Sequence, residues 1–257
     1  MAHPSRLNYR TQGQGPVVVL SHALGCHLGM WDEITELLQS EFTVVRYDHR
    51  GHGLSEVGQL DFNIEDMADD ASRFIQDVVG GPVHFVGLSM GGMVAQALAH
   101  RHPNLVNSIV IANSASHYND EARHQWHARI ETVRSQGMSA IADGAMQRWF
   151  STEFRMQIPR GIERVKAMRD ELIRNDPQAY AASCAAVAGI DFRKTNLGIR
   201  CKALIIAGER DEATPMAMSE AIADQIPQSQ LVSIDAAHLS ATEQPEAFVA
   251  LLKNFWR

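Results

Sequence analysis

Short apolar runs alternate with longer segments of helical periodicity over most of the chain. Residues 17–20 are a continuous apolar run, which is typical of a strand covered on both faces. In residues 64–79 the apolar side chains recur every three or four positions, which predicts an amphipathic helix. The whole pattern predicts strands at about 7–11, 17–20, 42–47, 83–86, 107–112, 203–207 and 230–234, and helices at about 29–39, 64–79, 93–99, 216–225 and 245–256. Strands that alternate with helices imply an α/β fold, with a mostly parallel sheet covered by helices on both faces.

The alternation stops between residues 116 and 194, where the composition predicts only helical segments. We interpret this stretch as a helical cap over the sheet edge at which open α/β sheets bind ligands. The predicted organisation is one α/β core, made of residues 1–115 and 195–257, with a helical cap at residues 116–194. A chain of 257 residues is long enough to bury a sizeable core.

Composition and charge narrow the function classes. Hydrophobic residues make up 45% and charged residues 21%, which is ordinary for a globular protein. The formal net charge of −7 provides no basic footprint, so nucleic acid is not an expected partner. The three cysteines are an odd number without metal-ligand spacing, which favours a reducing compartment and no metal site. The first six residues contain no apolar signal core and no apolar run is long enough to span a membrane, so we expect a cytoplasmic protein.

Residues 87–91 read Gly-Leu-Ser-Met-Gly and lie between a predicted strand and a predicted helix. This context predicts a nucleophile elbow, a sharp turn that exposes the hydroxyl of Ser89 above the sheet. The flanking glycines and Gly92 remove side chains that would collide where strand and helix meet. The helix that follows directs its positive N-terminal end at the charge that develops during acyl transfer. The pattern therefore predicts Ser89 as a nucleophile.

A serine hydroxyl needs a positioned base, and in elbows of this type the acid and then the histidine follow the serine along the chain. Of the twelve histidines, His238 has the best position, because it follows the last predicted strand. His22, His49 and His52 also follow predicted strands, but they precede Ser89. We therefore predict His238 as the base.

The predicted acid is Asp211, which follows the strand at 203–207. Glu209 and Glu212 flank it, and the sequence leaves both open as alternatives. Some triads of this kind take the acid from the strand after the elbow strand, but that place here is Asn113. A neutral amide cannot stabilise an imidazolium as a carboxylate does, which favours Asp211. Asp48 precedes the serine and is interpreted as holding its own turn.

Acyl transfer also needs two preorganised N–H donors for the oxyanion. The elbow geometry nominates the backbone N–H of Met90. The second donor is expected in the loop after the strand at 17–20, where Leu24 is preferred and Ala23 is the alternative.

Four motifs together resemble the α/β-hydrolase superfamily over nearly the whole chain. They are Gly87-Leu88-Ser89-Met90-Gly91-Gly92, Tyr47-Asp48-x-Arg50-Gly51-His52-Gly53-x-Ser55, Gly208-x-x-Asp211 and the terminal His238. Within the predicted cap, three further stretches resemble the 3-oxoadipate enol-lactonases of protocatechuate and catechol breakdown: Gln147-Arg148-Trp149-Phe150, Tyr180-x-x-x-Cys184-x-Ala186 and Asp191-Phe192-Arg193. Residues 21–31 are also similar to that group.

The chain departs from the enol-lactonase pattern in two places. His22-Ala23-Leu24-Gly25 stands where that group usually has Asn-Ser-Leu-Gly, and it resembles the His-Gly form of other esterases in the superfamily. The segment before residue 17 is shorter than the usual opening β-hairpin, so one edge strand is expected to be missing.

The resemblance implies a hydrolase whose substrate is an unsaturated lactone with a free carboxylate, and which needs no metal or organic cofactor. Arg148 is the preferred group for gripping the carboxylate, since a guanidinium offers a bidentate fork. Trp126 and Trp149 are expected to form apolar pocket wall, with core packing as the equal alternative. Residues 116–194 contain 12 Lys and Arg against 10 Asp and Glu, whereas the rest of the chain contains 11 against 20, so a basic lid would attract an anionic lactone or ester.

Two other kinds of function stay open. The first is a different activity with the same catalytic groups, such as that of a carboxylesterase, a C–C bond hydrolase or a cofactor-free perhydrolase. The second is a ligand-binding module that has kept the fold and lost turnover. The sequence leaves the oligomeric state undetermined.

Overall fold

Seven strands form one sheet in the computed structural model, which describes residues 6–257. The strands are β1 (Tyr9–Gln12), β2 (Val17–Ser21), β3 (Thr43–Tyr47), β4 (Val83–Leu88), β5 (Val106–Ala112), β6 (Lys202–Gly208) and β7 (Ser229–Ile234). Their order across the sheet is β1-β3-β2-β4-β5-β6-β7, and only β1 runs antiparallel to its neighbour. The carboxyl ends of β2 to β7 therefore meet at one edge.

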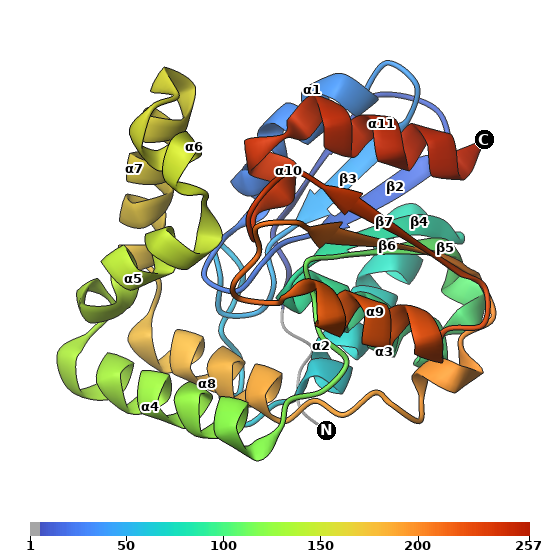
Figure 1. Cartoon of the computed structure of the whole chain (residues 1–257). Coiled ribbons are helices and arrows are strands. Elements are labelled where there is room, and N and C mark those ends of the chain that lie inside the picture. The colour runs from blue at the N-terminus through green and yellow to red at the C-terminus, as the bar shows by residue number, and fades with distance from the viewer. Residues whose placement is uncertain (1–5) are drawn as a thin grey trace.

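Helices cover both faces of this sheet, as the alternating pattern predicts (Figure 1). One face carries α1 (Asp32–Leu38) and α11 (Pro245–Trp256), and the other carries α2 (Ile64–Phe74), α3 (Met90–Arg101) and α9 (Met216–Gln225). Residues 18–20 in β2 are fully buried, which explains why this strand is apolar without alternation. The predicted α/β fold is confirmed.

Several helical segments differ from their predicted extent, and α3 extends beyond the predicted 93–99 at both ends. The predicted helix at 29–39 is a 3₁₀ turn (Leu28–Trp31) followed by α1, and the predicted helix at 64–79 is α2 followed by a π-helical turn (Ile75–Val79). The four-residue helix α10 (Ser240–Glu243) was not predicted, because one turn is too short to show periodicity.

Five helices fill the interval between β5 and β6, where the sequence predicts a cap. They are α4 (Asp120–Gln136), α5 (Ser139–Trp149), α6 (Thr152–Met156), α7 (Pro159–Ile173) and α8 (Pro177–Ala188). They lie to one side of the sheet, with α4 packed on α8 (Figure 1). An isolated bridge between His117 and Asp191 joins the two ends of the segment.

Polar contacts fasten this segment to the chain around α10. The backbone N–H of Leu239 donates to the carbonyl of Trp149 at 2.9 Å, and the Glu243 carboxylate accepts from the backbone N–H of Ser151 at 2.5 Å. Arg160 on α7 donates to the carbonyl oxygens of Thr242 and Glu243. The end of α5 is therefore bonded to the loop that carries His238.

One strand, β1, precedes β2 in the described residues, and it lies at the sheet edge with Tyr9 opposite Tyr47 of β3. The sequence prediction about a signal segment concerns residues 1–6, of which 1–5 lie outside the described part of the chain. Across residues 6–257, the structure has no helix with the length and apolar character needed to span a membrane.

Candidate active site

Ser89 occupies a strained turn between β4 and α3. Its φ of 56° and ψ of −115° lie outside the regions that L-residues favour, and its backbone N–H is held by the carbonyl of Ala112 at 2.8 Å. Glycine is required around it, because a Cβ on Gly87 would collide with the backbone of Gly91, and one on Gly91 with the backbone of Ser21. The local sequence therefore produces the sharp strand-turn-helix that the Gly-x-Ser-x-Gly pattern predicts.

Side chains from three separate loops meet at this turn. The Oγ of Ser89 lies 2.9 Å from the Nε2 of His238, and the Nδ1 of His238 lies 2.9 Å from the Oδ2 of Asp211. These residues follow β4, β7 and β6, whose carboxyl ends share one sheet edge. Because a carboxylate only accepts, Nδ1–H donates to Asp211 and leaves Nε2 free to accept from the serine hydroxyl.

Asp211 is held as a buried anion. Its Oδ1 accepts from the backbone N–H groups of Ala213 and Thr214, and its Oδ2 accepts from the Thr214 hydroxyl at 2.7 Å and from the Asn113 amide at 2.9 Å. Burial raises the pKa of Asp211, but the charge of His238 and these hydrogen bonds lower it by more. The net result is a pKa of about 2, below the usual value for an aspartate. The group is therefore ionised at neutral pH.

The two glutamates that flank Asp211 lie elsewhere. The Glu209 carboxylate is exposed and accepts a hydrogen bond from the hydroxyl of Ser233 at 2.7 Å. Glu212 is exposed and contributes to the wall of the cavity above Ser89. Of the three acidic candidates, the structure brings only Asp211 to the imidazole of His238. The earlier acid, Asp48, accepts from the backbone N–H groups of Leu28 and Leu54 and so holds its own turn.

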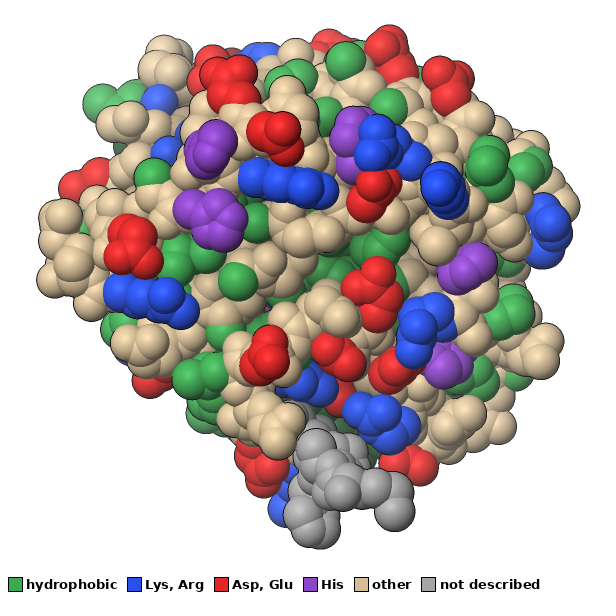
Figure 2. All heavy atoms as spheres, turned by 90° about the horizontal axis from the view of Figure 1, so that it is seen from below, with side chains coloured by type: hydrophobic (Ala, Val, Ile, Leu, Met, Phe, Trp, Pro, Cys, Tyr) green, Lys and Arg blue, Asp and Glu red, His purple; other side chains and the backbone are tan. Residues whose placement is uncertain are grey.

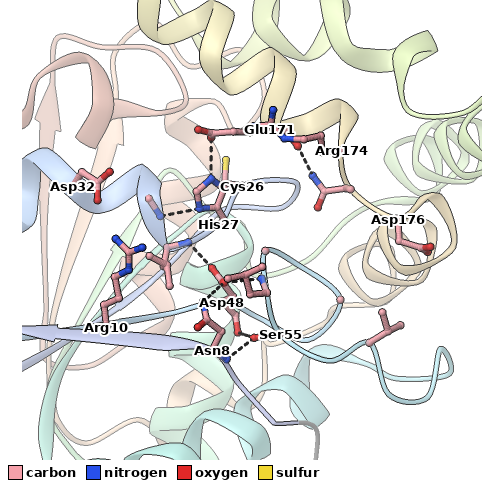
Figure 3. Close-up of a pocket in the computed structure, with 17 residues that line it drawn as sticks. Asn8, Arg10, Cys26, His27, Asp32, Asp48, Ser55, Glu171, Arg174 and Asp176 are labelled. Atoms are coloured by element: carbon pink, nitrogen blue, oxygen red, sulfur yellow. Dashed lines mark hydrogen bonds and ion pairs between the residues drawn. The ribbon is translucent and has the colours of Figure 1, made fainter.

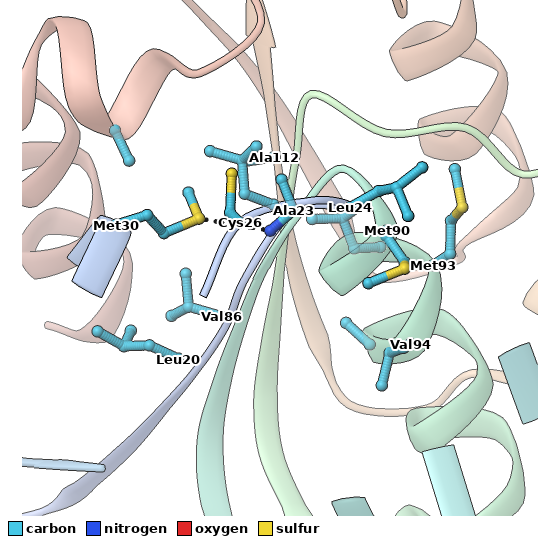
Figure 4. Close-up of a cluster of buried hydrophobic side chains, with 14 of the residues drawn as sticks. Leu20, Ala23, Leu24, Cys26, Met30, Val86, Met90, Met93, Val94 and Ala112 are labelled. Carbon is cyan, nitrogen blue, oxygen red and sulfur yellow. Dashed lines mark hydrogen bonds between the residues drawn. The ribbon is translucent and has the colours of Figure 1, made fainter. Parts of the chain in front are cut away.

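The loop after β2 lies beside the elbow, above a cluster of buried apolar side chains that includes Met30 and Met90 (Figure 4). The N–H of Ala23 is directed at the sulfur of Met30 at 3.4 Å. For the backbone N–H of Leu24, the structure of residues 6–257 contains no acceptor within hydrogen-bond reach. Leu24 therefore keeps a free donor beside Ser89, whereas Ala23 does not.

Buried histidines hold this loop from below. The Nε2 of His22 accepts from the backbone N–H of His49 at 2.9 Å, and the Nε2 of His52 accepts from the backbone N–H of Gly25 at 3.1 Å. Burial, with smaller contributions from neighbouring histidines and other charges, lowers the pKa of His22 to about 3 and that of His52 to about 4, and it lowers the pKa of His49 well below 6.5. The cluster is therefore neutral at pH 7.

This neutrality predicts an acid-sensitive fold. Below the ordinary histidine pKa of about 6.5, His22, His49 and His52 bind protons in the unfolded chain but stay neutral in the folded protein, where they are buried. The free energy of unfolding should therefore fall from about pH 6.5 to pH 4, by at most about 1.4 kcal/mol per pH unit for each histidine. His27, whose pKa is raised by a hydrogen bond to Glu171, opposes the trend. Urea unfolding at pH 7, 6 and 5 measures the slope.

A His49→Gln variant should show a shallower pH dependence, because it removes one of the buried titrating groups. His124, which is exposed on α4, provides the matched control, and His124→Gln should leave the slope unchanged. A slope that is the same for His49→Gln and the unmodified protein would contradict this account of the cluster.

Helix α7 and the residues after it hold the outer side of the same loop. The Nε2 of His27 lies 3.3 Å from a carboxylate oxygen of Glu171, and the amide of Asn175 donates to the carbonyl of Gly25 at 3.0 Å. A cavity of about 550 Å³ separates the loop from this part of the cap (Figure 3). None of the residues Ser89, Asp211 and His238 lines it, so it is not the space in which these groups would act.

A second cavity, of about 300 Å³, opens directly above Ser89 and His238. The three residues predicted to contact substrate, Trp126, Arg148 and Trp149, all line it. Trp149 is also almost fully buried, so its ring serves both as core packing and as cavity wall. Leu24 lines the cavity as well, whereas the side chain of Met90 points into the core.

Sequence reasoning missed Arg129, which lines the same cavity with its guanidinium 4.4 Å above the Trp126 ring. Within the described residues, neither Arg129 nor Arg148 makes an ion pair. Burial and then the charge of Arg129 lower the pKa of Arg148, so the two cations repel each other across the cavity. The spacing of Trp126 and Arg129, one helical turn apart, was the signal that could have identified this residue.

Charge on the outer surface is mixed. On the face shown in Figure 2, acidic and basic side chains are interspersed rather than gathered by sign. Ion pairs such as Arg169–Asp143 and Arg193–Asp191 use several of the cap arginines. The small positive excess of residues 116–194 is therefore partly neutralised locally.

Neither the cysteines nor a metal site provides an alternative catalytic centre in the described part of the chain. Burial raises the pKa of all three thiols, and that of Cys184 to about 12, so none is an activated nucleophile. Among residues 6–257, no group of three or more His, Cys, Asp or Glu side chains is arranged to hold a metal ion.

Known proteins share both the sequence and this arrangement of elements. A family model described as the alpha/beta hydrolase fold matches residues 16–245. The chain is 33% identical over 255 residues to 3-oxoadipate enol-lactonase 2 of Acinetobacter baylyi, covering 97% of this chain and 94% of that protein. It is 30% identical to a pimeloyl-[acyl-carrier protein] methyl ester esterase of Chromobacterium violaceum, covering 94% of each.

Among solved structures, the enol-lactonase from Burkholderia xenovorans LB400 superposes with a TM-score of 0.93 at 32% identity, covering 99% of this chain and 98% of that one. The predicted resemblance to α/β-hydrolases, and within them to the enol-lactonases, is confirmed. Since the family model covers most of the chain and the relatives match nearly their full length, the chain belongs to the α/β-hydrolase family.

Proposed function

We propose that this protein is a serine hydrolase that opens a carboxylate-bearing lactone of the 3-oxoadipate enol-lactone type. The observation that carries the proposal is the hydrogen-bonded series Ser89–His238–Asp211 at the floor of a cavity. The same cavity holds two arginines that have no carboxylate partner among residues 6–257. The names of the relatives, enol-lactonases and a methyl ester esterase, support cleavage of a carboxylic ester bond.

The chemistry follows from the geometry. Ser89 Oγ attacks the lactone carbonyl carbon while His238 Nε2 takes the hydroxyl proton, and Asp211 stabilises the imidazolium that results. The N–H groups of Met90 and Leu24 donate to the oxyanion. Collapse of the tetrahedral intermediate breaks the ring C–O bond, and His238 returns the proton to the leaving enol oxygen, which stays tethered through the acyl-enzyme.

Deacylation repeats these steps with water. His238 removes a proton from water as it attacks the ester of Ser89, and the second tetrahedral intermediate releases the carboxylic acid. The serine recovers its proton from the imidazolium, and the enol product tautomerises to a 3-oxo acid. The residues named here supply the nucleophile, the base and the oxyanion donors, so the scheme assigns no step to a metal or an organic cofactor.

The cavity supports an anionic substrate. Two guanidinium groups that repel each other across the cavity gain a shared counter-charge when a carboxylate binds, and Arg–carboxylate pairs are frequently bidentate. A volume of about 300 Å³ fits a small ring compound rather than a long acyl chain. We assign the grip to Arg148, with Arg129 as its partner, and the apolar walls to Trp126 and Trp149.

The test compares enol-lactone prepared in situ with a neutral p-nitrophenyl ester of similar size. We expect the larger kcat/KM for the enol-lactone. A strong preference for the neutral ester would remove the carboxylate grip and favour a general carboxylesterase. Activity confined to C–C cleavage, or to peroxide-dependent halogenation, would favour the other chemistries. If a serine-directed fluorophosphonate left the protein unlabelled, the result would contradict a hydrolase and favour a ligand-binding module.

Replacing Arg148 with methionine should separate binding of the anion from chemistry. We expect kcat/KM for the enol-lactone to fall about 10- to 100-fold, the worth of one charge-assisted hydrogen bond, with little change for the neutral ester. Arg134→Met, on the exposed side of α4, is the matched control and should leave both rates unchanged. Equal losses for both substrates would show that Arg148 supports the fold of the cavity rather than the carboxylate.

A further inference from the structure

Asn113 stands where some hydrolases of this fold carry the acid, and the proposed function gives it no part. It directly follows β5, has a φ of 48° and is completely buried. Its backbone N–H donates to the carbonyl of Ile206 on β6. A positive φ is unusual for any residue other than glycine, although asparagine tolerates it better than most. A buried polar side chain on a backbone with an unusual φ calls for an explanation.

The contacts of its amide are complete. The Nδ2 of Asn113 lies 2.9 Å from the Oδ2 of Asp211 and 3.3 Å from the carbonyl oxygen of Ala237. On its other side, the Oδ1 lies 2.5 Å from the hydroxyl of Ser240, the first residue of α10. Ser240 is completely buried too.

Chemistry fixes the direction of every one of these bonds. The carboxylate of Asp211 and the carbonyl of Ala237 only accept, so the NH₂ end of Asn113 must face both of them. That leaves Oδ1 for the hydroxyl of Ser240, which donates. Without this donor, Oδ1 would be buried with no hydrogen-bond partner, so the amide would be held at its NH₂ end alone and less firmly in place.

We propose that Asn113, held by Ser240, is a positioning residue that aligns the loop carrying Asp211 with the loop carrying His238. The inference rests on the proposed function, because it assigns a role in aligning that acid and base. One amide group contacts the acid itself and the carbonyl of the residue that immediately precedes the base. It therefore sets the distance between the two partners of the His238–Asp211 hydrogen bond without touching substrate.

The same contacts also weaken the hold of the Asp211 carboxylate on the imidazolium proton of His238. The Oδ2 of Asp211 accepts from His238, Thr214 and Asn113, and each donor beyond His238 withdraws negative charge from the bond to the imidazole. Removing the Asn113 donor should therefore let the carboxylate hold the imidazolium proton more tightly. That effect appears in the pH dependence of the reaction, whereas a role in folding alone does not.

The experiment compares Asn113→Ala and Ser240→Ala with the unmodified protein, using a neutral p-nitrophenyl ester. For Asn113→Ala we expect kcat to fall about 10- to 100-fold, a fraction of the roughly 10⁴-fold that loss of the acid costs, with KM nearly unchanged. The acidic limb of the kcat/KM profile should move to higher pH. Ser240→Ala should shift both quantities in the same direction by a smaller factor.

Ser219→Ala is the matched control, because Ser219 is also completely buried but its hydroxyl has no hydrogen-bond partner in the described residues. It should leave kcat and the pH profile unchanged. If Asn113→Ala does not fold, Ser240→Ala carries the test, since it removes one oxygen atom and leaves the amide in place. Thermal unfolding of each variant confirms that the rates refer to folded protein.

Each of three outcomes would overturn a specific claim. If Asn113→Ala and Ser240→Ala fold and retain the kcat and pH profile of the unmodified protein, Asn113 is not a positioning residue, although the hydrolase stands. If fluorophosphonate fails to label the unmodified protein, the proposed function fails first. A loss of stability without any shift of the acidic limb would reduce the role of Asn113 to folding.

Discussion

Ser89→Ala should abolish measurable hydrolysis while leaving the fold intact. Loss of the nucleophile from a Ser–His–Asp triad lowers kcat by about 10⁶-fold, and the residual rate comes from the oxyanion donors and binding. Within residues 6–257 the hydroxyl of Ser89 has one hydrogen-bond partner, the Nε2 of His238 at 2.9 Å, so its removal costs the fold little. Stopped assays with enol-lactone and with a p-nitrophenyl ester, together with fluorophosphonate labelling, measure the loss.

Ser135→Ala is the control for this prediction, because Ser135 is exposed on α4 and its hydroxyl contacts only the backbone of its own helix. A Ser89→Gly variant tests the backbone strain of the elbow as well. It should be as inactive as Ser89→Ala but more stable by about 1 kcal/mol, since the φ of 56° favours glycine. Substantial turnover in folded Ser89→Ala would overturn the mechanism.

Asp211→Asn should have the second largest effect, a fall in kcat of about 10⁴-fold. An amide at this position donates as readily as it accepts, so it favours the wrong tautomer of His238 and cannot stabilise the imidazolium. The site around it is built for an anion, with four donors other than His238 directed at the two carboxylate oxygens. Steady-state kinetics over pH 5–9, with circular dichroism to confirm folding, measure the loss.

Glu209→Gln is the matched control for the acid. It makes the same chemical change two residues away, at a carboxylate whose one hydrogen-bond donor within the described part of the chain is Ser233. We expect kcat and KM to stay at the values of the unmodified protein. If Glu209→Gln lost as much activity as Asp211→Asn, our assignment of Asp211 as the acid would be wrong.

Much of the fold followed from local pattern. The continuous apolar run of β2 predicted a strand buried on both faces, and the glycines around Ser89 predicted a turn that no bulkier residue can make. These features depend on neighbours a few positions apart, which is why composition and periodicity are enough to find them. The short helix α10 and the π-helical turn after α2 lie below the resolution of periodicity.

Part of the site also followed from the order of residues along the chain. Ser89, Asp211 and His238 were predicted because each follows a strand, and parallel strands bring their carboxyl ends to one edge. The sequence left Glu209 and Glu212 open, however, since three of the four turn positions 209–212 carry similar carboxylates. Only the path of the loop after β6 turns one of them toward the imidazole.

The sequence by itself determined the family, the layering of the fold and the strained serine, because these depend on short-range periodicity and on backbone sterics. The tertiary structure alone decided the rest: which acid meets His238, that Asn113 joins two loops more than 90 positions away, and that Arg129 faces Arg148 across one cavity. Those pairings depend on strand register and helix packing, which bring together residues that no local pattern relates.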